Sequence, residues 1–185
     1  MDHLPVSAAH ADAQTEADPG WHTLLAARPA APWRIEPLGP FDDCLAIARL
    51  ITHAFQATHG YPLGQILDEL MPRSGHRYRQ FFVARRGEQV LGVAGIKAAD
   101  WASDTHILFR TAVAPEARGQ GLARALVDAR LAWLDARLPG GRVLVSCRSP
   151  GRFAERGFVP VGAPGPRGWQ LMILDRSEPD PGLVQ

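Results

Sequence analysis

The spacing of apolar residues near the start of the chain changes from strand-like alternation to a helical repeat. Residues 33–38 (WRIEPL) alternate well enough for a first strand, which a proline and a following Gly-Pro pair end. Residues 41–55 then show the three- and four-residue spacing of an amphipathic helix, which Asp42 or Asp43 is placed to cap. Residues 65–71 predict a second, shorter helix. The apolar face of the first helix consists of Leu45, Ala48, Ile51 and Phe55.

The middle of the chain alternates in the manner of an antiparallel sheet. Residues 81–84 and 90–97 predict two strands around a short turn at 86–88, which is typical of a hairpin. Residues 104–113 predict the next strand, and strict alternation divides its side chains between two faces. One face is expected to carry Thr105, Ile107, Phe109 and Thr111, and the other His106, Leu108 and Arg110.

A long amphipathic helix is predicted from residue 122 to about residue 138, where a Pro-Gly-Gly sequence ends it. Its apolar stripe consists of Leu122, Leu126, Ala129 and Trp133. Its charged residues predict a solvated outer face made of Arg124, Asp128, Arg130, Asp135 and Arg137.

The remainder of the domain predicts a strand, a short helix and two further strands. Residues 142–147 form a compact strand, which a right-handed crossover makes parallel to the strand at 104–113. Ser149 has the position of an N-cap before a proline in the first turn, and Gly157 suits the left-handed residue that closes the short helix. The final strands are expected at 158–161 and 169–174.

Composition predicts one folded domain with two appendages. Residues 1–31 are rich in Ala, Asp, Pro and Thr and predict a flexible extension. The domain is expected at 32–175, and residues 176–185 predict a polar tail. A hydrophobic fraction of 46% and a charged fraction of 21% are ordinary for a soluble globular protein.

Charge and cysteine content argue against several functions. A formal net charge of +1, without a basic stripe interleaved with aromatics, predicts no binding to nucleic acid or to an anionic membrane. No apolar run approaches the roughly 18 residues that a membrane helix needs. Cys44 and Cys147 are the only cysteines, too few for a disulfide framework and too widely spaced for a zinc knuckle. We therefore expect no metal site and a reducing, cytoplasmic setting.

The most specific chemistry lies where the strand at 104–113 meets the long helix. Proline at position 115 cannot donate to a sheet ladder, so the strand should end near Val113. A basic segment with two glycines follows, Arg118-Gly119-Gln120-Gly121, and the helix begins at once. Glycine lets backbone N–H groups approach a ligand closely, and the first amides of a helix favour anions. This stretch predicts a cradle for a phosphate or pyrophosphate, to which Arg118 adds a positive charge.

Two common phosphate-binding motifs do not fit this stretch. The dinucleotide fingerprint G-x-G-x-x-G has Arg124 at its third glycine, and the G-K-[ST] of a P-loop is absent. The sequence instead reads R-x-x-G-x-A from Arg118 to Ala123, preceded by V-A-P-E. This combination resembles the pyrophosphate-binding motif of the GNAT superfamily of acyl-CoA-dependent N-acetyltransferases. A second stretch, F-A-E-R-G-F from Phe153 to Phe158, is similar to the family's Y-E-x-x-G-F.

The resemblance covers roughly residues 33–174 and implies a fold and a cofactor. The fold is α/β of the mixed kind: a GNAT-like, mostly antiparallel sheet of six to seven strands, with a parallel pair that splays apart, flanked by about four helices. The cofactor is acetyl-CoA, whose pantetheine arm enters the splay and pairs with the main chain of Ala112 and Val113. Its pyrophosphate is expected on Arg118, Gly119, Gln120, Gly121, Leu122 and Ala123. Ser146 and Phe153 are assigned to the cofactor as well.

The chemistry implied by the resemblance is direct attack of a neutral amine on the thioester, with the oxyanion held by backbone N–H near Val113. In many relatives a tyrosine protonates the leaving thiolate, and here Phe153 stands at that position without a hydroxyl. An ordered water, Cys147, Ser146 or Ser149 substitutes for it, or the thiolate leaves unassisted. The strand before the cradle offers two candidates for the general base, Asp104 and His106, and a histidine titrates in the right range.

Contacts to the acceptor are expected in the segment 54–79, because loops beside a rigid sheet commonly carry substrate contacts. His59, Tyr61 and His76 are the candidates. The sequence therefore predicts an N-acetyltransferase that acts on a primary amine of a small molecule or peptide. Because the acid position holds Phe153 and no carboxylate base is evident, a coenzyme A-binding sensor with weak or no turnover is the alternative. Many relatives pair through their final strands, so a homodimer is also expected.

Overall fold

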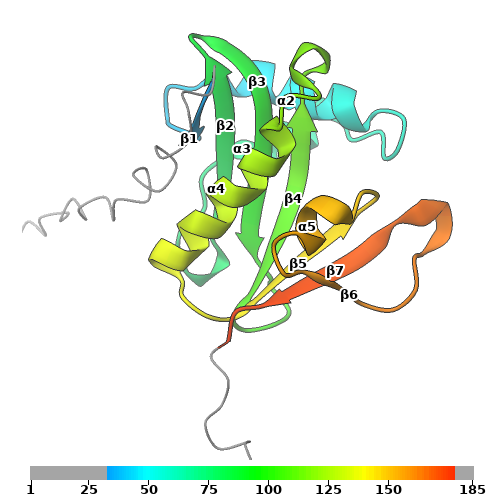
Figure 1. Ribbon diagram of the computed structural model, residues 1–185. Coiled ribbons are helices and arrows are strands. Elements are labelled where there is room, and N and C mark those ends of the chain that lie inside the picture. The colour runs from blue at the N-terminus through cyan, green and yellow to red at the C-terminus, as the bar shows by residue number, and fades with distance from the viewer. Residues whose placement is uncertain (1–32, 178–185) are drawn as a thin grey trace, which may run out of the picture.

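A seven-stranded sheet with the order β1-β2-β3-β4-β5-β7-β6 forms the centre of the molecule (Figure 1). The computed structural model describes residues 33–177, apart from the side chain of His76, so the predicted extension at 1–31 lies outside this range. All neighbouring strands are antiparallel except β4 and β5, which confirms the predicted mixed sheet with one parallel pair. The strands are β1 (Arg34–Pro37), β2 (Arg79–Arg86), β3 (Gln89–Ala98), β4 (Thr105–Val113), β5 (Arg142–Cys147), β6 (Val159–Pro160) and β7 (Gln170–Asp175).

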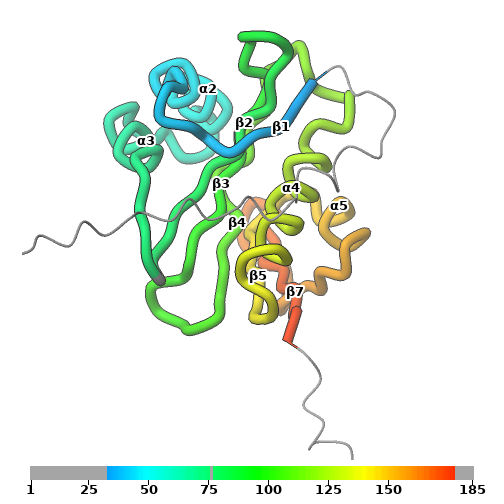
Figure 2. Tube along the Cα trace, turned by 90° about the vertical axis from the view of Figure 1, so that its left-hand side faces the viewer, coloured from blue at the N-terminus to red at the C-terminus, as the bar shows by residue number. Residues whose placement is uncertain are grey.

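Helices cover both faces of this sheet. In the described residues they are α2 (Cys44–Phe55), α3 (Leu63–Leu70), α4 (Leu122–Arg137) and α5 (Gly151–Ala154), with short 3-10 turns η1 (Gly75–Arg77), η2 (Pro115–Ala117) and η3 (Pro166–Gly168). Figure 2 shows α2 and α3 on one side of the sheet and α4 and α5 on the other. Two separate apolar cores follow, one packed around Ile47 and Phe81 and the other around Leu108, Leu126 and Val143.

Helix α4 lies with its predicted stripe against the sheet. Leu122, Leu126, Ala129 and Trp133 are all buried. The placement of Arg130 on the outer surface is wrong, because this side chain is fully buried. It lies four residues after Leu126 and three before Trp133, so helical geometry turns it inward with them. Its Nε donates to the carbonyl of Leu126 at 2.9 Å and its Nη1 to the carbonyl of Gly95 at 3.0 Å.

The ends of two helices differ in how well local sequence predicted them. Of the two predicted caps, Asp42 and Asp43, it is Asp43 that caps α2. Its side chain accepts a hydrogen bond from the backbone amide of Ala46 at 2.9 Å. Gly157 has the predicted left-handed conformation after α5, with φ 82°. Ser149 is not the N-cap, however, because α5 begins one residue later and Pro150 occupies that position without a side-chain cap. The hydroxyl of Ser149 is therefore not used by the helix.

A β-bulge in β4 overturns the predicted alternation of its side chains. Gly95 of β3 pairs with Phe109, whereas Val93 pairs with Ala112, so β4 contains an extra residue in this interval. Arg110, at φ 52°, lies within the bulge. Leu108 packs on the α4 side, but Arg110 turns to the opposite side and binds Glu69 of α3. The bulge therefore redirects Arg110 from the face on which strict alternation placed it.

Candidate active site

Strands β4 and β5 lie side by side only in their first halves. The parallel pairing runs from Thr105 with Arg142 to Leu108 with Val145. Beyond it, β4 continues along β3 while β5 continues along β7, so the two strands separate (Figure 1). In the described structure, residues 109–113 of β4 have no strand partner on the edge that faces β5. Such an open edge offers backbone groups to an extended ligand.

A glycine turn and an uncapped helix follow directly after β4. Gly119 and Gly121 have φ values of 75° and 80°, in the left-handed region that favours glycine. Gly121 is the N-cap of α4 and supplies no side chain to the helix amides. Among the described residues, the backbone N–H groups from Gly119 to Ala123 donate no hydrogen bond. The turn thus presents unsatisfied donors at the positive end of a helix of 16 residues.

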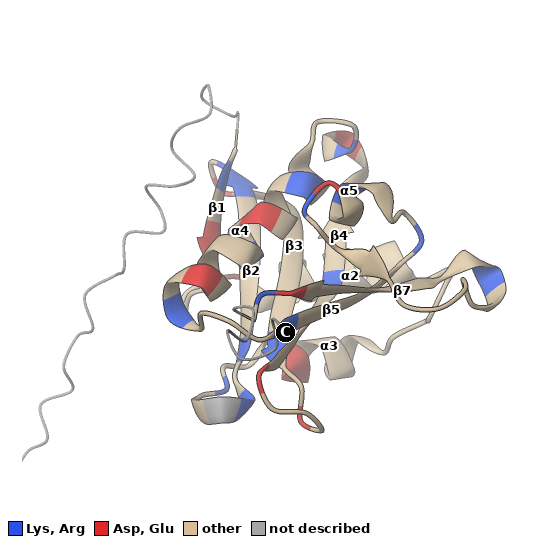
Figure 3. Cartoon of the chain, turned by 60° about the horizontal axis from the view of Figure 1, so that its bottom comes forward, with Lys and Arg blue, Asp and Glu red and all other residues tan. Residues whose placement is uncertain are grey.

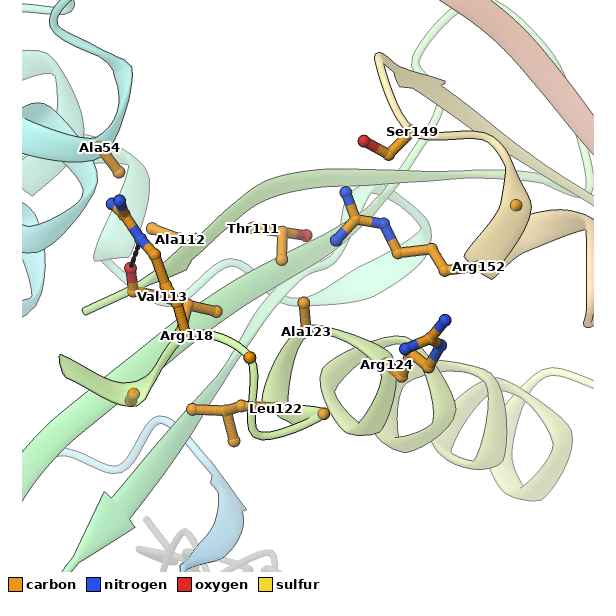
Figure 4. Close-up of a pocket in the computed structure, with 14 residues that line it drawn as sticks. Ala54, Thr111, Ala112, Val113, Arg118, Leu122, Ala123, Arg124, Ser149 and Arg152 are labelled. Atoms are coloured by element: carbon orange, nitrogen blue, oxygen red, sulfur yellow. Dashed lines mark hydrogen bonds between the residues drawn. The ribbon is translucent and has the colours of Figure 1, made fainter. Parts of the chain in front are cut away.

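These groups open onto a cavity of about 630 Å³ between β4, α4 and α5 (Figure 4). The predicted cofactor residues that line it are Ala112, Val113, Arg118, Gly119, Gly121, Leu122 and Ala123. Gln120 does not line it, and its side-chain Nε2 donates to the carbonyl of Glu116 at 3.0 Å. The Nε of Arg118 donates to the carbonyl of Val113 at 3.3 Å, as the dashed line in Figure 4 shows. The cavity has the donors and the positive charge that a diphosphate requires.

A second cavity of about 420 Å³ occupies the splay between β4 and β5. It shares Thr111 and Arg152 with the first cavity, so the two cavities lie next to each other at these side chains. Of the residues predicted to take part in binding or catalysis, His59, Tyr61, Ser146, Cys147 and Phe153 line it. The fold therefore gathers residues from the loop after α2, from β5 and from α5 around the place where the strands part.

The ring of His59 is held by aromatic neighbours on two sides. It stacks on Tyr61 with ring centroids 5.0 Å apart and meets Trp169 edge-on at 5.4 Å. Its Nδ1 lies 2.9 Å from Oγ1 of Thr58, whose hydroxyl donates to the carbonyl of Phe55 at 3.2 Å. Because a hydroxyl has a single proton, this pair of contacts assigns Oγ1 as the acceptor of a proton on Nδ1 of the imidazole. The neutral ring then carries its proton on Nδ1, and Nε2 is left as an acceptor.

The candidates for protonating a leaving thiolate differ in their environments. Cys147 is buried, and this burial raises the pKa of its thiol, while a hydrogen bond from the Ser149 backbone and the charge of Arg152 oppose the rise. Ser149 is exposed and lines the first cavity. Phe153 is buried against Phe158, with ring centroids 5.5 Å apart, and offers no proton. A protonated thiol and a hydroxyl are thus both close to the splay.

His106 and Asp104 do not meet the cradle. They line a third cavity of about 630 Å³ at the beginning of β4, whereas the cradle follows its end. Nδ1 of His106 lies 2.9 Å from the hydroxyl of Tyr78. Burial lowers the pKa of His106, and repulsion from Arg176 adds to this effect against the attraction of Asp104. His76 is in η1, away from the residues that line the splay, and its side chain lies outside the described structure.

Several residues at the splay were not among the predicted site residues. Arg110 of the bulge forms a two-pronged ion pair with Glu69 of α3, with both N–O distances at 2.7 Å. Arg152 and Trp169 also line the second cavity. Arg152 lies directly beside Phe153 in the recognised F-A-E-R-G-F stretch, a signal that could have marked it. Glu69 and Trp169 lie outside both recognised sequence motifs, and no local pattern indicates that they belong to the site.

Other classes of site receive no support from the described residues. Within them, no group of His, Cys, Asp and Glu could hold a metal ion. No described helix is both long and apolar enough to cross a membrane. In the view of Figure 3, Lys and Arg are interspersed with Asp and Glu over the described surface.

A splayed parallel pair that leads into a glycine turn and an uncapped helix forms a site for an extended ligand that carries a phosphate. Residues 44–158 match the family Acetyltransferase (GNAT), and the chain belongs to this family. The family's cofactor is acetyl-CoA, as the sequence predicted. No protein of curated function matches the chain in sequence.

Solved structures of the same fold include proteins with different acceptors. An acyl-CoA N-acyltransferase from Pseudomonas aeruginosa has a TM-score of 0.62 at 18% identity, over 76% of this chain and 98% of that one. The ribosomal-protein-S18-alanine N-acetyltransferase from Escherichia coli has a TM-score of 0.58 at 18% identity, over 83% and 99%. N-acetylglutamate synthase from Neisseria gonorrhoeae, solved with coenzyme A and N-acetyl-glutamate, has a TM-score of 0.61 at 13% identity, over 82% and 36%. At these identities the likeness establishes the fold.

Proposed function

We propose that this protein is an N-acetyltransferase that transfers an acetyl group from acetyl-CoA to a primary amine bound at the splay. The observation that carries the proposal is the set of unsatisfied amides from Gly119 to Ala123, which lie beside a cavity that the free end of β4 also lines. The diphosphate of acetyl-CoA binds those amides and Arg118. The pantetheine arm then follows the free edge of β4 beside Ala112 and Val113, and the thioester reaches the second cavity.

In the proposed reaction the amine nitrogen attacks the thioester carbonyl within this second cavity. A C–N bond forms, the C–S bond breaks, and the sulfur leaves with its electron pair as coenzyme A thiolate. The nitrogen must lose one proton during this exchange. Backbone N–H groups on the free edge of β4 stabilise the negative charge that develops on the carbonyl oxygen.

We propose His59 as the acceptor of that proton. No carboxylate lines the second cavity, and its arginines are already protonated. The hydrogen bond of His59 to Thr58 leaves Nε2 as a proton acceptor. His106 and Asp104, the bases that the sequence suggested, line a different cavity, and this proposal gives them no catalytic role.

The thiolate that leaves needs little assistance. The thiol of coenzyme A resembles that of cysteine, with a pKa of about 8.5, so the thiolate is a tolerable leaving group near neutral pH. Ser149, whose hydroxyl is not engaged in capping α5, lies on the cofactor cavity and is proposed to stabilise the sulfur by donating a hydrogen bond. Cys147, which burial keeps protonated, is the second proposed donor.

The test is to incubate the full chain with acetyl-CoA and a broad panel of amines, and to follow the release of free thiol. Amine-dependent release and a product heavier by one acetyl group are expected. His59→Gln should then lower kcat by about 10²- to 10⁴-fold, the usual contribution of a general base, without changing the affinity for acetyl-CoA. His53→Gln is the matched control, since His53 is an exposed residue of α2 outside the second cavity. Equal activity of the two variants would contradict the role of His59.

The second candidate function is a coenzyme A-binding sensor without turnover. Phe153, which stands where many relatives carry an acid, favours it. Tight binding of acetyl-CoA by calorimetry together with no thiol release in any condition would support the sensor. Amine-dependent turnover by the wild type would eliminate it.

A further inference from the structure

The charged side chains that line the second cavity, which we call the acceptor cavity, are all positive. Arg110, Arg148 and Arg152 line it, and none of its lining residues is Asp or Glu. Most of its remaining wall is apolar or aromatic, and such walls screen charge poorly. The substrates that this cavity can bind therefore depend on which of these arginines already have a counter-charge in the protein.

Arg110 is already neutralised. Its Nε and Nη2 both donate to the carboxylate of Glu69 at 2.7 Å, and its Cζ lies 3.6 Å from the ring centroid of Tyr61. Its side chain is only 11% exposed. This arginine is therefore part of the wall, and its charge is not available to a ligand.

Arg148 and Arg152 have no such partner. Within the described residues no carboxylate forms a salt bridge with either side chain. Arg148 is exposed at the end of β5. Arg152 is half-buried, and its Nε is buried without a hydrogen-bond partner. Arg152 lines the cofactor cavity as well, and Figure 4 shows its guanidinium extending from α5 toward Thr111, the other residue that the two cavities share.

A buried guanidinium donor without an acceptor is unfavourable, because the group has lost water and gained nothing in exchange. A carboxylate in the cavity would supply the counter-charge that the accessible part of this guanidinium lacks, and it matches the planar fork of the group. A polycationic amine would instead place further positive charge beside two unpaired arginines.

We propose that the amine acceptor of this protein carries a carboxylate, as an amino acid does, and that Arg152 and Arg148 bind it. The proposal rests on the proposed acetyl transfer, which it extends by naming the class of acceptor. Arg152 positions the acceptor through its carboxylate, so that the amine faces the thioester.

The test compares acceptors that differ only in this charge. L-Glutamate, L-methionine and L-phenylalanine are each assayed with acetyl-CoA beside the corresponding α-carboxamide, and spermidine serves as the polycationic amine. For at least one amino acid, kcat/KM should exceed that of its carboxamide by about 10- to 100-fold, as expected for hydrogen bonds to a charged group. Equal or greater activity with the carboxamides or with spermidine would overturn the proposal.

Variants locate the charge that is responsible. Arg152→Gln should raise KM for the amino acid at least 10-fold while the Kd of acetyl-CoA stays unchanged, and Arg148→Gln should do so to a smaller extent. Arg167→Gln, at an exposed arginine outside both cavities, should change neither value. If Arg152→Gln weakened acetyl-CoA binding instead, the arginine would belong to the cofactor and the proposal would fail. Faster transfer from succinyl-CoA than from acetyl-CoA, lost in Arg152→Gln, would assign the carboxylate to the acyl group and would also overturn it.

A binding measurement separates this proposal from the proposed activity. The same amino acids and carboxamides are titrated into the complex of the protein with coenzyme A, and heats of binding are recorded. Binding of an amino acid but not of its carboxamide, abolished by Arg152→Gln, supports the carboxylate site even if no acceptor is turned over. No binding of any amino acid refutes it even if another amine is acetylated.

Discussion

Glu69 of α3 and Arg110 of β4 form a two-pronged ion pair that holds the β-bulge at the splay. Their side chains are 16% and 11% exposed, and both N–O distances are 2.7 Å. Burial by itself raises the pKa of Glu69, but the hydrogen bonds and charge of Arg110, with help from Gln65 and Arg79, outweigh it and lower the pKa overall. The pair thus fixes a left-handed residue, Arg110 at φ 52°, where L side chains are rarely found.

Glu69→Gln should destabilise the protein by about 2–4 kcal/mol, because it leaves the mostly buried guanidinium of Arg110 without its counter-charge. Chemical denaturation at pH 7 measures this change in the free energy of unfolding. Glu36→Gln is the control, since Glu36 pairs with Arg34 in an exposed ion pair and should change stability by about 0.5 kcal/mol or less. Comparable effects of the two substitutions would show that the pair at the bulge contributes no more than a surface contact.

The same pair predicts a dependence of stability on pH. The pKa of Glu69 is lower in the folded protein than in the unfolded chain, so the unfolded chain binds more protons as the solution becomes acidic. The stabilisation is complete above the unfolded value of about 4.3 and is lost as the pH falls through the lowered folded value. Denaturation curves from pH 7 to pH 3 should therefore be flatter in Glu69→Gln than in the wild type. Parallel curves would contradict the assignment.

The features that local sequence predicted correctly are those made by neighbouring residues. The glycine turn from Gly119 to Gly121 depends on backbone conformations within a few positions, and Asp43 caps its own helix. In contrast, the pairing of Glu69 with Arg110 spans 41 residues and depends on the bulge. An inserted residue in a strand reverses the side-chain pattern beyond it, and periodicity alone does not reveal where it lies.

Two further residues show how contacts between distant segments decide what local sequence leaves open. Arg130 was placed on the surface because it is charged, although its helical spacing places it with the buried stripe, where backbone carbonyls accept its hydrogen bonds. The sequence places His106 in the strand before the cradle, and its role as a base stays a prediction. That strand is long enough to carry its two ends to different cavities. The roles of both residues are decided by contacts between distant segments.

Gly121→Ala should weaken the binding of acetyl-CoA at least 10-fold. Gly121 has φ 80° and lines the cofactor cavity, and a Cβ there would meet no protein atom but would enter the open space of the cradle. The left-handed conformation also adds about 1–2 kcal/mol of strain. Isothermal titration calorimetry measures the affinity and thermal unfolding measures the strain. Gly64→Ala, within α3 and equally free of neighbours, is the control and should leave the affinity unchanged. Normal acetyl-CoA binding by Gly121→Ala would refute the position of the diphosphate.

His106→Gln should leave acetyl transfer within about threefold of the wild type, because this residue lines a cavity apart from the splay. Loss of the contact with Tyr78 should cost about 1 kcal/mol of stability at neutral pH. Burial lowers the folded pKa of His106, so its contribution is present above the unfolded value of about 6.5 and is lost as the pH falls through the folded one. Unfolding between pH 8 and pH 5 should depend less on pH in this variant. A 100-fold loss of kcat would instead restore His106 as the base.

Phe153→Tyr should retain the fold and leave kcat unchanged or raise it. The ring lines the acceptor cavity beside the splay, so a hydroxyl at its edge adds a proton donor for the departing thiolate. Phe158→Tyr is the matched control: Phe158 is equally buried but does not line the cavity, and a hydroxyl without a partner should cost about 1–3 kcal/mol there with no gain in rate. Rates of thiol release and thermal midpoints of both variants test this contrast. A large loss of activity in Phe153→Tyr, at unchanged stability, would mean that the bare ring itself shapes the path of the thioester.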